Sequence, residues 1–356
     1  MLKKLFISLV ILILILVGSF YGMKVWMKSL IPDKTYYETL KKTLKSDLDY
    51  LTSNTPEYRG KILAVVTNVG DMGEQLSAGF ELTELARAYW VFTANGFEVD
   101  IASPKGGHPP SVLDADDMGA YDYAFINDPA SQTKLENSIA LADIEPMDYK
   151  AVYFVGGKGT MFDFPENKDI QRIVKALYEE SRVISAVCHG PAALLNVRLD
   201  DGKYLLAGKD VTGFTNHEEL FLIPNANEVF PFLLEDMLVE RGGNFLSGAR
   251  YLEHVTQDGK LITGQNPWSV WKVAELVVEE LGYEPKPRPR TEEEYAIELL
   301  MIYEAEGYEA AQEAILKSPH AFQNVTILSH ALVSIMDFEA SKGFELLRLA
   351  NSLKDR

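Results

Sequence analysis

The chain contains the stretch Val183-Ile-Ser-Ala-Val-Cys-His-Gly-Pro-Ala-Ala-Leu194, in which a largely apolar run ends at its only cysteine, Cys188. Small residues follow the cysteine, as they do where a strand turns sharply into a helix and exposes a nucleophile at its carboxyl end. The amino end of a helix stabilises a thiolate, so the pattern predicts a lowered pKa and a reactive thiol. A lone cysteine on an apolar strand is more often a small core residue, but the adjacent His189 favours the nucleophile.

Other short apolar runs flank this stretch and alternate with segments of helical period. Strands are expected at 61–69, 97–103, 149–155 and 183–187, and helices at 80–95, 170–180 and 269–281. Runs buried on both faces and separated by helices are typical of a parallel sheet. We therefore expect an α/β fold with a doubly wound, mostly parallel sheet and helices on both faces. Turn residues also predict hairpins at 200–214 and 251–265.

A glycine-rich loop, Gly156-Gly-Lys-Gly-Thr-Met-Phe-Asp163, follows the strand expected at 149–155. Its backbone N–H groups can reach the same edge of the sheet as Cys188 and bind a developing oxyanion there. The spacing fits neither a Walker loop nor a dinucleotide-binding loop. The sequence therefore predicts an oxyanion or substrate site formed by Gly156, Gly157, Lys158, Gly159, Asp163 and Gly190.

Two segments offer carboxylates that could serve the cysteine and the histidine. Glu84 lies in the first expected helix, where it can face the same edge of the sheet. A solvated helix face is the plainer interpretation of Glu84, and equally of Glu81. Glu218 and Glu219 stand at an expected helix start, where acidic residues are favoured as caps in any case. The residues alone leave these alternatives open.

The N-terminal segment contains an uncharged apolar run of about 17 residues, 5–21, which is near the lower limit for a membrane-spanning helix. No small-x-small cleavage site follows it, and Trp26 fits an interfacial aromatic. We expect a membrane anchor over 1–32, as a single-pass signal anchor; a buried core helix is the alternative. Two lysines before the run favour a cytoplasmic amino end and an extracytoplasmic globular part, although lysines also follow it.

The 356 residues allow a large domain with appendages. We expect a juxtamembrane helix or stalk over 33–58, the α/β domain over 59–283 and a stiff proline-rich linker over 284–290. Residues 291–356 have helical period throughout and contain two similar motifs about 35 residues apart, close to the tetratricopeptide period. Two copies fall short of the three or more that stacked repeats need, so a plain helical bundle is an equal alternative.

Composition excludes several classes of function. The formal net charge of −18 and the lack of a Lys/Arg cluster argue against nucleic-acid binding. One cysteine cannot form an internal disulfide. The six histidines are scattered and show no metal-ligand spacing. We expect no metal, no cofactor and no nucleic-acid partner.

Four blocks taken together resemble the PfpI-like superfamily, which has the class I glutamine amidotransferase-like fold and includes the Parkinson's-associated deglycase. The blocks occur in order, at 79–84 with 102–107, 156–163, 186–193 and 211–219. The chain is most similar to the glyoxalase III and heat-inducible holding-chaperone branch. The resemblance covers about 61–283, or two thirds of the chain, and implies a flavodoxin-like sheet.

The resemblance also implies roles for single residues. Cys188 matches the nucleophile, His189 the triad histidine and Glu84 the carboxylate that hydrogen-bonds the cysteine. Glu219 is the better-spaced match to the acidic member that orients the histidine, with Glu218 as the fallback.

Backbone amides complete the implied site, since those of Gly157 and His189 match the oxyanion hole. Lys158 departs from the branch, which often has histidine there. We expect a lysine at this position to change the substrate preference or the pKa of the cysteine.

The function implied is cofactor-independent, glyoxalase III-type conversion of methylglyoxal to lactate, or a related deglycation, with a small reactive carbonyl compound as substrate. A homodimer and a protein partner bound through the C-terminal helices are also expected. The alternative is a holding chaperone or stress-response protein with the same fold. Amidase or peptidase activity remains a third option, because one fold supports many chemistries.

Overall fold

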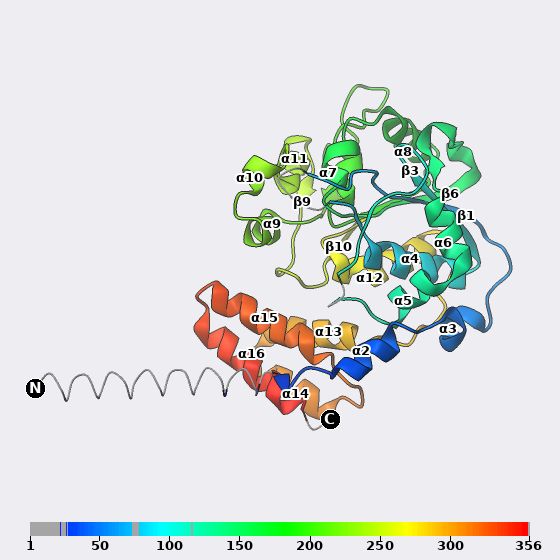
Figure 1. Ribbon diagram of the computed structural model, residues 1–356. Coiled ribbons are helices and arrows are strands. Elements are labelled where there is room, and N and C mark those ends of the chain that lie inside the picture. Colours follow the sequence, from blue (N-terminus) through cyan, green and yellow to red (C-terminus); the bar gives the residue numbers. More distant parts are fainter. Residues whose placement is uncertain (1–21, 23–25, 27, 73–77, 115–116, 355–356) are drawn as a thin grey trace, which may run out of the picture. The chain divides into compact units, whose positions relative to one another are not determined.

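The computed structural model describes residues 22, 26, 28–72, 78–114 and 117–354. It divides into two compact units, one formed by the described residues up to Glu38 with 290–354 and the other by 39–289 (Figure 1). The apolar run 5–21, predicted to anchor the chain in a membrane, lies outside the described residues. None of the described helices is both long and apolar enough to cross a bilayer.

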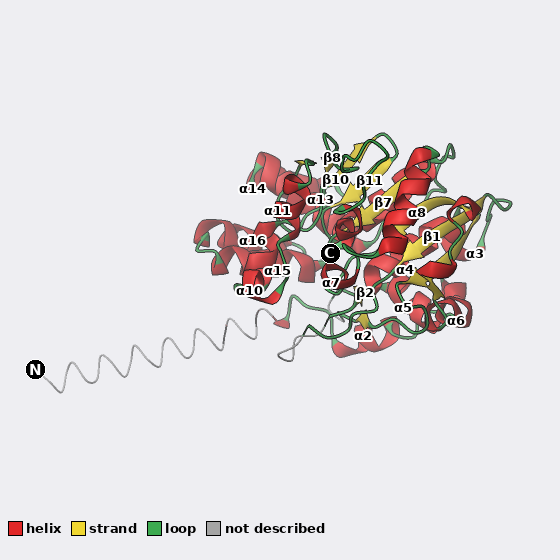
Figure 2. Ribbon diagram, turned by 90° about the horizontal axis from the view of Figure 1, so that it is seen from above, coloured by secondary structure: helices red, strands yellow, loops and turns green. Residues whose placement is uncertain are grey.

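The larger unit is built on a seven-stranded sheet with the order β10-β11-β7-β6-β1-β3-β5 (Figure 2). Its strands are β1 (Gly60–Val65), β3 (Phe97–Ser103), β5 (Ile139–Ala140), β6 (Tyr149–Phe154), β7 (Val183–Val187), β10 (Val255–Asp258) and β11 (Leu261–Gly264). All neighbouring pairs are parallel except β10 and β11. The predicted α/β fold with a mostly parallel sheet is confirmed.

Helices cover both faces of this sheet. They include α4 (Leu82–Ala94), α5 (Ala120–Asn127), α6 (Pro129–Glu136), α8 (Lys168–Glu179) and α12 (Val270–Glu280). The β1–α4–β3 and β6–α8–β7 crossovers run in opposite directions along the sheet, so right-handed connections place α4 and α8 on opposite faces (Figure 1). On α8, Ile170, Ile173, Val174 and Leu177 form the buried stripe, which the spacing of the sequence predicted.

Short elements fill the connections of the larger unit. They are η1 (Lys45–Asp47), α3 (Asp49–Thr52), β2 (Phe80–Glu81), β4 (Ser111–Val112), η2 (Leu141–Asp143), η3 (Pro146–Asp148), α7 (Thr160–Asp163), η4 (Gly190–Leu194), β8 (Asp210–Val211), α9 (Asn216–Leu222), α10 (Ala226–Val229), α11 (Leu234–Glu240), β9 (Asn244–Phe245) and η5 (Pro267–Ser269). The first predicted helix therefore begins at Leu82, because Phe80 and Glu81 pair with β4 instead.

Of the two predicted hairpins, the second is confirmed as the antiparallel pair β10–β11. The first, at 200–214, is wrong. Only an isolated bridge joins Arg198 and Tyr204, and β8 pairs in parallel with β9. The reason is that Leu205 and Leu206 are buried directly after the bridge, which carries the chain into the core before a second ladder can form.

The proline-alternating segment 284–290 packs along the larger unit up to its boundary. Arg288 stacks on Trp271 at 3.9 Å and pairs with Glu275 at 3.2 Å. Lys286 donates to backbone carbonyls of Tyr50 and Ser53. Side-chain contacts therefore hold a segment that cannot form backbone ladders.

The smaller unit is helical, as the sequence predicted for 291–356. It contains α13 (Glu292–Glu306), α14 (Tyr308–Lys317), α15 (Asn324–Met336) and α16 (Ala340–Ser352), and α2 (Lys34–Leu40) begins within it. Gly343 allows α16 to approach α15, since a Cβ there would lie 2.4 Å from Ile335 Cγ1. Trp26 Nε1 donates to Asn351 Oδ1 at 2.9 Å, which ties the N-terminal segment to α16.

Candidate active site

The turn at Cys188 carries the chain from β7 into η4. Cys188 has a φ of +59°, a left-handed conformation that costs a non-glycine residue free energy and persists only where its surroundings hold it. Its N–H donates to Gly264 O at 2.9 Å, and its carbonyl accepts from Phe214 N at 2.8 Å. The predicted sharp turn is present, but the segment after it is a five-residue 3₁₀ helix and not an α-helix.

Three buried side chains form a continuous chain of hydrogen bonds at this turn. Cys188 Sγ lies 3.3 Å from His189 Nδ1, and His189 Nε2 lies 2.5 Å from Glu219 Oε2. An ionised carboxylate only accepts, so the contact assigns the ring proton to Nε2 and leaves Nδ1 to accept from the thiol. Each of the three residues is 3% exposed, which limits competition from water. Of the two predicted carboxylates on α9, Glu219 is the one that contacts the histidine.

Glu84 lies on the first turn of α4 and is fully buried. Its Oε2 accepts from Gly156 N at 2.7 Å, and both this oxygen and Cys188 Cβ lie against Gly156, so the carboxyl group is close to the thiol. Burial raises the pKa of Glu84 well above its usual range, and the nearby Glu81 raises it further. Burial therefore favours the protonated form of Glu84, which can supply a proton.

Burial also raises the pKa of the Cys188 thiol well above its usual range, and Glu84 and Glu81 add to the effect. The predicted lowering of the thiol pKa is therefore wrong. The short 3₁₀ helix supplies little of the dipole on which that prediction relied, while desolvation and the neighbouring carboxyls both oppose negative charge on sulfur. The thiol rests in its neutral form, with His189 placed to accept its proton.

The paired glycines of the 156–163 loop permit a close approach that a side chain would prevent. A Cβ on Gly156 would lie 2.7 Å from both Cys188 Cβ and Glu84 Oε2. Gly157 has a φ of +106°, and a Cβ there would lie 2.3 Å from Gly79 O. The backbone N–H groups of Gly157 and His189 donate to no other described residue, which leaves them available to an oxyanion beside Cys188.

Lys158 and Glu81 lie beside the paired glycines and are both partly exposed. Glu81 N donates to Gly156 O at 3.3 Å, which fixes the two segments against each other. Burial raises the pKa of Glu81 to about 7, against the opposing positive charge of Lys158. A carboxyl group with a pKa near neutral therefore lies close to Lys158, the residue at which this loop departs from the branch that it resembles.

The other predicted members of the loop have packing contacts. Asp163 accepts from Thr67 Oγ1 and from Asn68 N, each at 2.8 Å, and so holds the segment after β1. A Cβ on Gly159 would lie 2.5 Å from the carbonyl oxygen of Val69, and one on Gly190 would lie 2.3 Å from that of Phe154. These contacts build the loop and the turn, and the structure places neither Gly159 nor Asp163 in contact with Cys188.

Sequence reasoning missed an aromatic group around the histidine. The ring of Phe214 lies 4.6 Å from that of His189, with the planes tilted by 34°. The ring of Phe230 lies 6.3 Å from that of His189, and the partly exposed Phe162 lies 6.0 Å from Phe230. The one signal in the sequence was the position of Phe214 directly before Thr215, next to the predicted carboxylate motif.

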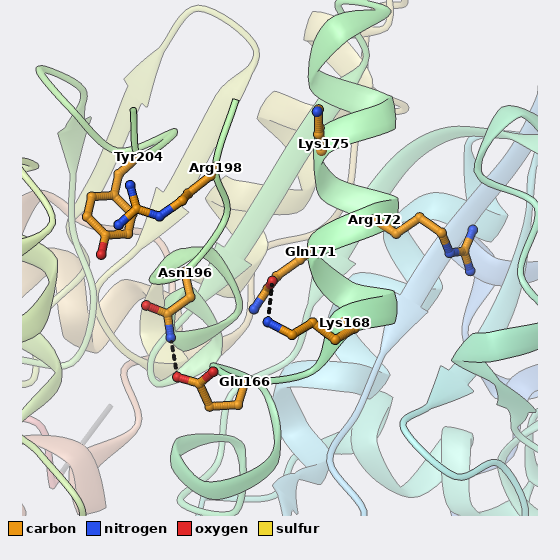
Figure 3. A pocket seen from close by; sticks show the side chains of 8 residues that line it. All are labelled: Glu166, Lys168, Gln171, Arg172, Lys175, Asn196, Arg198 and Tyr204. Atoms are coloured by element: carbon orange, nitrogen blue, oxygen red, sulfur yellow. Dashed lines mark hydrogen bonds between the residues drawn. The ribbon is translucent and has the colours of Figure 1, made fainter. Parts of the chain in front are cut away.

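A separate hollow of about 510 Å³ lies between α8 and the segment 196–204 (Figure 3). Its lining is Glu166, Lys168, Gln171, Arg172, Lys175, Asn196, Arg198 and Tyr204. The basic groups are largely paired: Lys175 contacts Asp200, and Arg172 points away from Tyr204 to bind carbonyls. None of the residues around Cys188 lines it. Elsewhere in the described ranges, no three His, Cys, Asp or Glu side chains gather as metal ligands would.

Residues 75–280 match the model of the DJ-1/PfpI family. Glyoxalase 3 of Candida albicans is 30% identical over an alignment of 238 positions that covers 61% of this chain and 97% of that protein. The crystal structure of glyoxalase III from the same organism has a TM-score of 0.57 at 28% identity and covers 63% of this chain and 98% of that one. Rapid Encystment Protein 24 kDa of Francisella tularensis has a TM-score of 0.60 at 36% identity and covers 63% of this chain and all of that one.

Proposed function

The chain belongs to the DJ-1/PfpI family, and on that premise we propose that it is a cofactor-independent enzyme of the glyoxalase III type, converting methylglyoxal to lactate. The observation that carries the proposal is the buried contact of Cys188 with His189, together with the buried Glu84 carboxyl close to the thiol, whose pKa is raised. A nucleophile flanked by a base and an acid suits addition to an aldehyde followed by proton transfer. The glyoxalase names of the relatives support the same chemistry.

In the first step, Cys188 Sγ would bond to the aldehyde carbon while the thiol proton passes to His189 Nδ1, 3.3 Å away. The carbonyl oxygen, as it gains charge, would be held by the N–H groups of Gly157 and His189. Return of the proton from the imidazole to that oxygen gives a neutral hemithioacetal. The neutral histidine is then free to act as a base again.

In the second step, the proton on the former aldehyde carbon would move to the neighbouring carbonyl carbon through an enediol. His189 is placed to remove it and return it to the neighbouring carbon, and Glu84 to protonate the carbonyl oxygen of that carbon and then regain a proton from the hydroxyl group on the former aldehyde carbon. The product is a lactoyl thioester of Cys188. Water then cleaves the carbon–sulfur bond and releases lactate and the free thiol. Overall, methylglyoxal and water are converted to lactate and a proton.

The test uses the full chain and its variants Cys188→Ala and Cys188→Ser. We expect the parent protein to form lactate from methylglyoxal without glutathione, and both variants to lose that activity, because a hydroxyl is a much weaker nucleophile here. Circular dichroism of each variant checks the fold. Lactate production that is absent from the parent, or unchanged in the variants, would refute the proposal.

We also propose that residues 1–32 anchor the chain in a membrane with the globular part on the extracytoplasmic side. The support is the apolar run of about 17 residues with an aromatic residue on its far flank. Membrane fractionation of cells, followed by protease treatment of intact cells, tests both parts. Recovery in the fraction that high salt releases would contradict the anchor.

A second candidate function is that of a holding chaperone, and exposed apolar side chains on the smaller unit favour it. Met336, Phe338 and Phe344, at the α15–α16 turn, are 66%, 95% and 63% exposed. Such side chains can bind unfolded clients. The candidate predicts suppression of client aggregation that survives Cys188→Ala and falls in Phe338→Ser/Phe344→Ser; the opposite pattern would exclude it.

A further inference from the structure

Glu218 is completely buried, yet it forms no ion pair with a Lys, Arg or His side chain among the residues that the structure describes. Its carboxylate instead accepts five hydrogen bonds. Oε2 accepts from the N–H and the hydroxyl of Thr215 at 3.0 and 2.9 Å. Oε1 accepts from Tyr251 N at 2.8 Å and from the side-chain amides of Gln265 and Asn266 at 3.0 Å each. Neutral donors therefore replace the water that burial removes.

These donors come from three separate segments of the chain. Thr215 caps α9, Tyr251 belongs to the connection before β10, and Gln265 and Asn266 directly follow β11. Tyr251 has a φ of +57°, a strained conformation for a tyrosine, and its hydroxyl also donates to Glu218 O at 2.9 Å. Glu218 thus holds Tyr251 at both its backbone and its ring.

Two series of contacts lead from this cluster to His189. Along the first, Glu219 follows Glu218 on the first turn of α9 and contacts His189 Nε2. Along the second, the ring of Tyr251 lies 6.4 Å from that of Phe214, which in turn lies 4.6 Å from the imidazole. We refer to these rings as the aromatic stack.

We propose that Glu218 is a positioning residue for His189, acting through the first turn of α9 and through the aromatic stack. It touches neither Cys188 nor the histidine ring, so it takes no part in bond making. Its kinetic consequence rests on the proposed function, but its effect on the imidazole does not. The carboxylate aligns the histidine for the thiol proton, and a small misalignment at such a site lowers turnover strongly.

The smaller unit contains a matched control. Thr291 and Glu294 form the same capping box at α13: Thr291 N donates to Glu294 Oε2 at 2.8 Å, and Glu294 N donates to Thr291 Oγ1 at 3.1 Å. Gln replaces Glu readily in a capping box, because one acceptor oxygen suffices. Glu294→Gln should therefore be nearly silent. Glu218→Gln would keep its cap but turn an NH₂ group toward Tyr251 N and two further donors.

The experiment measures the full chain and the variants Glu218→Gln and Glu294→Gln by proton NMR and by steady-state kinetics. The 2.5 Å contact of His189 Nε2 with Glu219 should give a strongly deshielded proton signal, identified by its loss in His189→Ala. We expect Glu218→Gln to abolish or shift that signal and to lower kcat by roughly 10- to 100-fold, with KM within about twofold. Glu294→Gln should change neither quantity.

A folded Glu218→Gln that keeps both the signal and kcat would overturn the proposal. If that variant does not fold, Asn266→Ala decides, because it removes one of the Oε1 donors and leaves the cap intact. A shifted signal with reduced kcat then supports the role, and an unchanged signal with unchanged kcat overturns it. Should the parent make no lactate, the proposed function fails while the NMR signal still tests Glu218.

Discussion

Buried carboxyl groups lie near Cys188 on both α4 and α9, which we call the α4 side and the α9 side of the site. The two sides differ in the number of hydrogen-bond donors that surround these groups. On α4, Glu84 accepts from one backbone N–H, and its Oε1 receives no hydrogen bond from any described N–H or O–H group. On α9, Glu218 accepts five hydrogen bonds, and Glu219 binds the imidazole. Burial with few donors raises the pKa of Glu84 on the α4 side, whereas the α9 side supplies hydrogen-bond donors and an imidazole to its carboxyl groups.

The difference shows that burial alone does not determine what a carboxyl group does. Burial with few donors favours the protonated form of a carboxyl group, and hydrogen bonds from donors favour the charged form. Cys188 and His189 meet both kinds of group, since Glu84 lies close to the thiol and Glu219 binds the imidazole. Substitutions on either side test whether the carboxyl groups of α4 and α9 have these different roles.

The largest effect is expected for Glu84→Gln. The amide oxygen can still accept from Gly156 N, so the fold should persist, but the side chain can no longer exchange a proton. We expect kcat for lactate formation to fall by about 10³-fold, within the range of general acid–base catalysis. Steady-state kinetics measure it. A fall of less than about threefold would mean that the α4 side holds no working acid.

A smaller effect is expected for Glu219→Gln on the α9 side. The variant keeps the size of the side chain but removes the charge that orients the imidazole and stabilises its protonated form. We expect kcat to fall by about 10²-fold with little change in KM. The double variant Glu84→Gln/Glu219→Gln tests whether the sides act together, since dependent groups give a loss well below the product of the two.

Gly156→Ala should disturb the α4 side without removing a functional group. The added Cβ would lie 2.7 Å from both Cys188 Cβ and Glu84 Oε2, so one of them must move. Overpacking of this kind costs about 1–3 kcal/mol of unfolding free energy. Chemical denaturation of the variant measures the loss. Gly119→Ala is the control, because its nearest atom would be 3.8 Å away and it should cost much less.

Much of the larger unit was predictable because its signals are local. The runs at 97–103 and 183–187 are strands with the predicted bounds, since each is short, buried and ended by a turn. The hairpin predicted at 200–214 is wrong. Its turn residues do mark a turn, but the burial of Leu205 and Leu206 determines the path of the chain beyond that turn. Turn chemistry predicts local reversal but not the partner of the next strand.

The site was predictable as a set of residues but not in its electrostatics. The turn after β7 and the resemblance together identified Cys188, yet the direction of its pKa shift depends on Glu84, which precedes it by 104 residues. The resemblance gave Glu218 only as the fallback for the acidic triad member, and its local signal was that of a helix cap, which Glu294 shares. What separates these two glutamates is the set of donors that folding brings to the first, and no local pattern encodes that set.

The smallest effect concerns the partly exposed Glu81 and appears as a pH dependence. Its pKa in the folded chain is raised to about 7 from an ordinary value of 4.5, mainly by burial. The folded state therefore binds the proton more tightly than the unfolded state, and this contribution to stability is complete below about pH 4.5 and is lost as pH rises through about 7. Asp163, with its pKa raised to about 6, acts in the same direction.

Thermal unfolding of the full chain between pH 5 and pH 8 measures this dependence. We expect Tm to fall as pH rises, and Glu81→Gln to reduce that fall, because the amide cannot lose a proton on the α4 side. Glu294→Gln, which alters a glutamate of the smaller unit, should leave the fall unchanged. An equal fall in Glu81→Gln and in the parent would assign the pH dependence to other groups and leave Glu81 ionised beside Lys158. The α4 side would then contain an ionised carboxylate as well as an acid. Glu84 alone would then distinguish the α4 side from the α9 side.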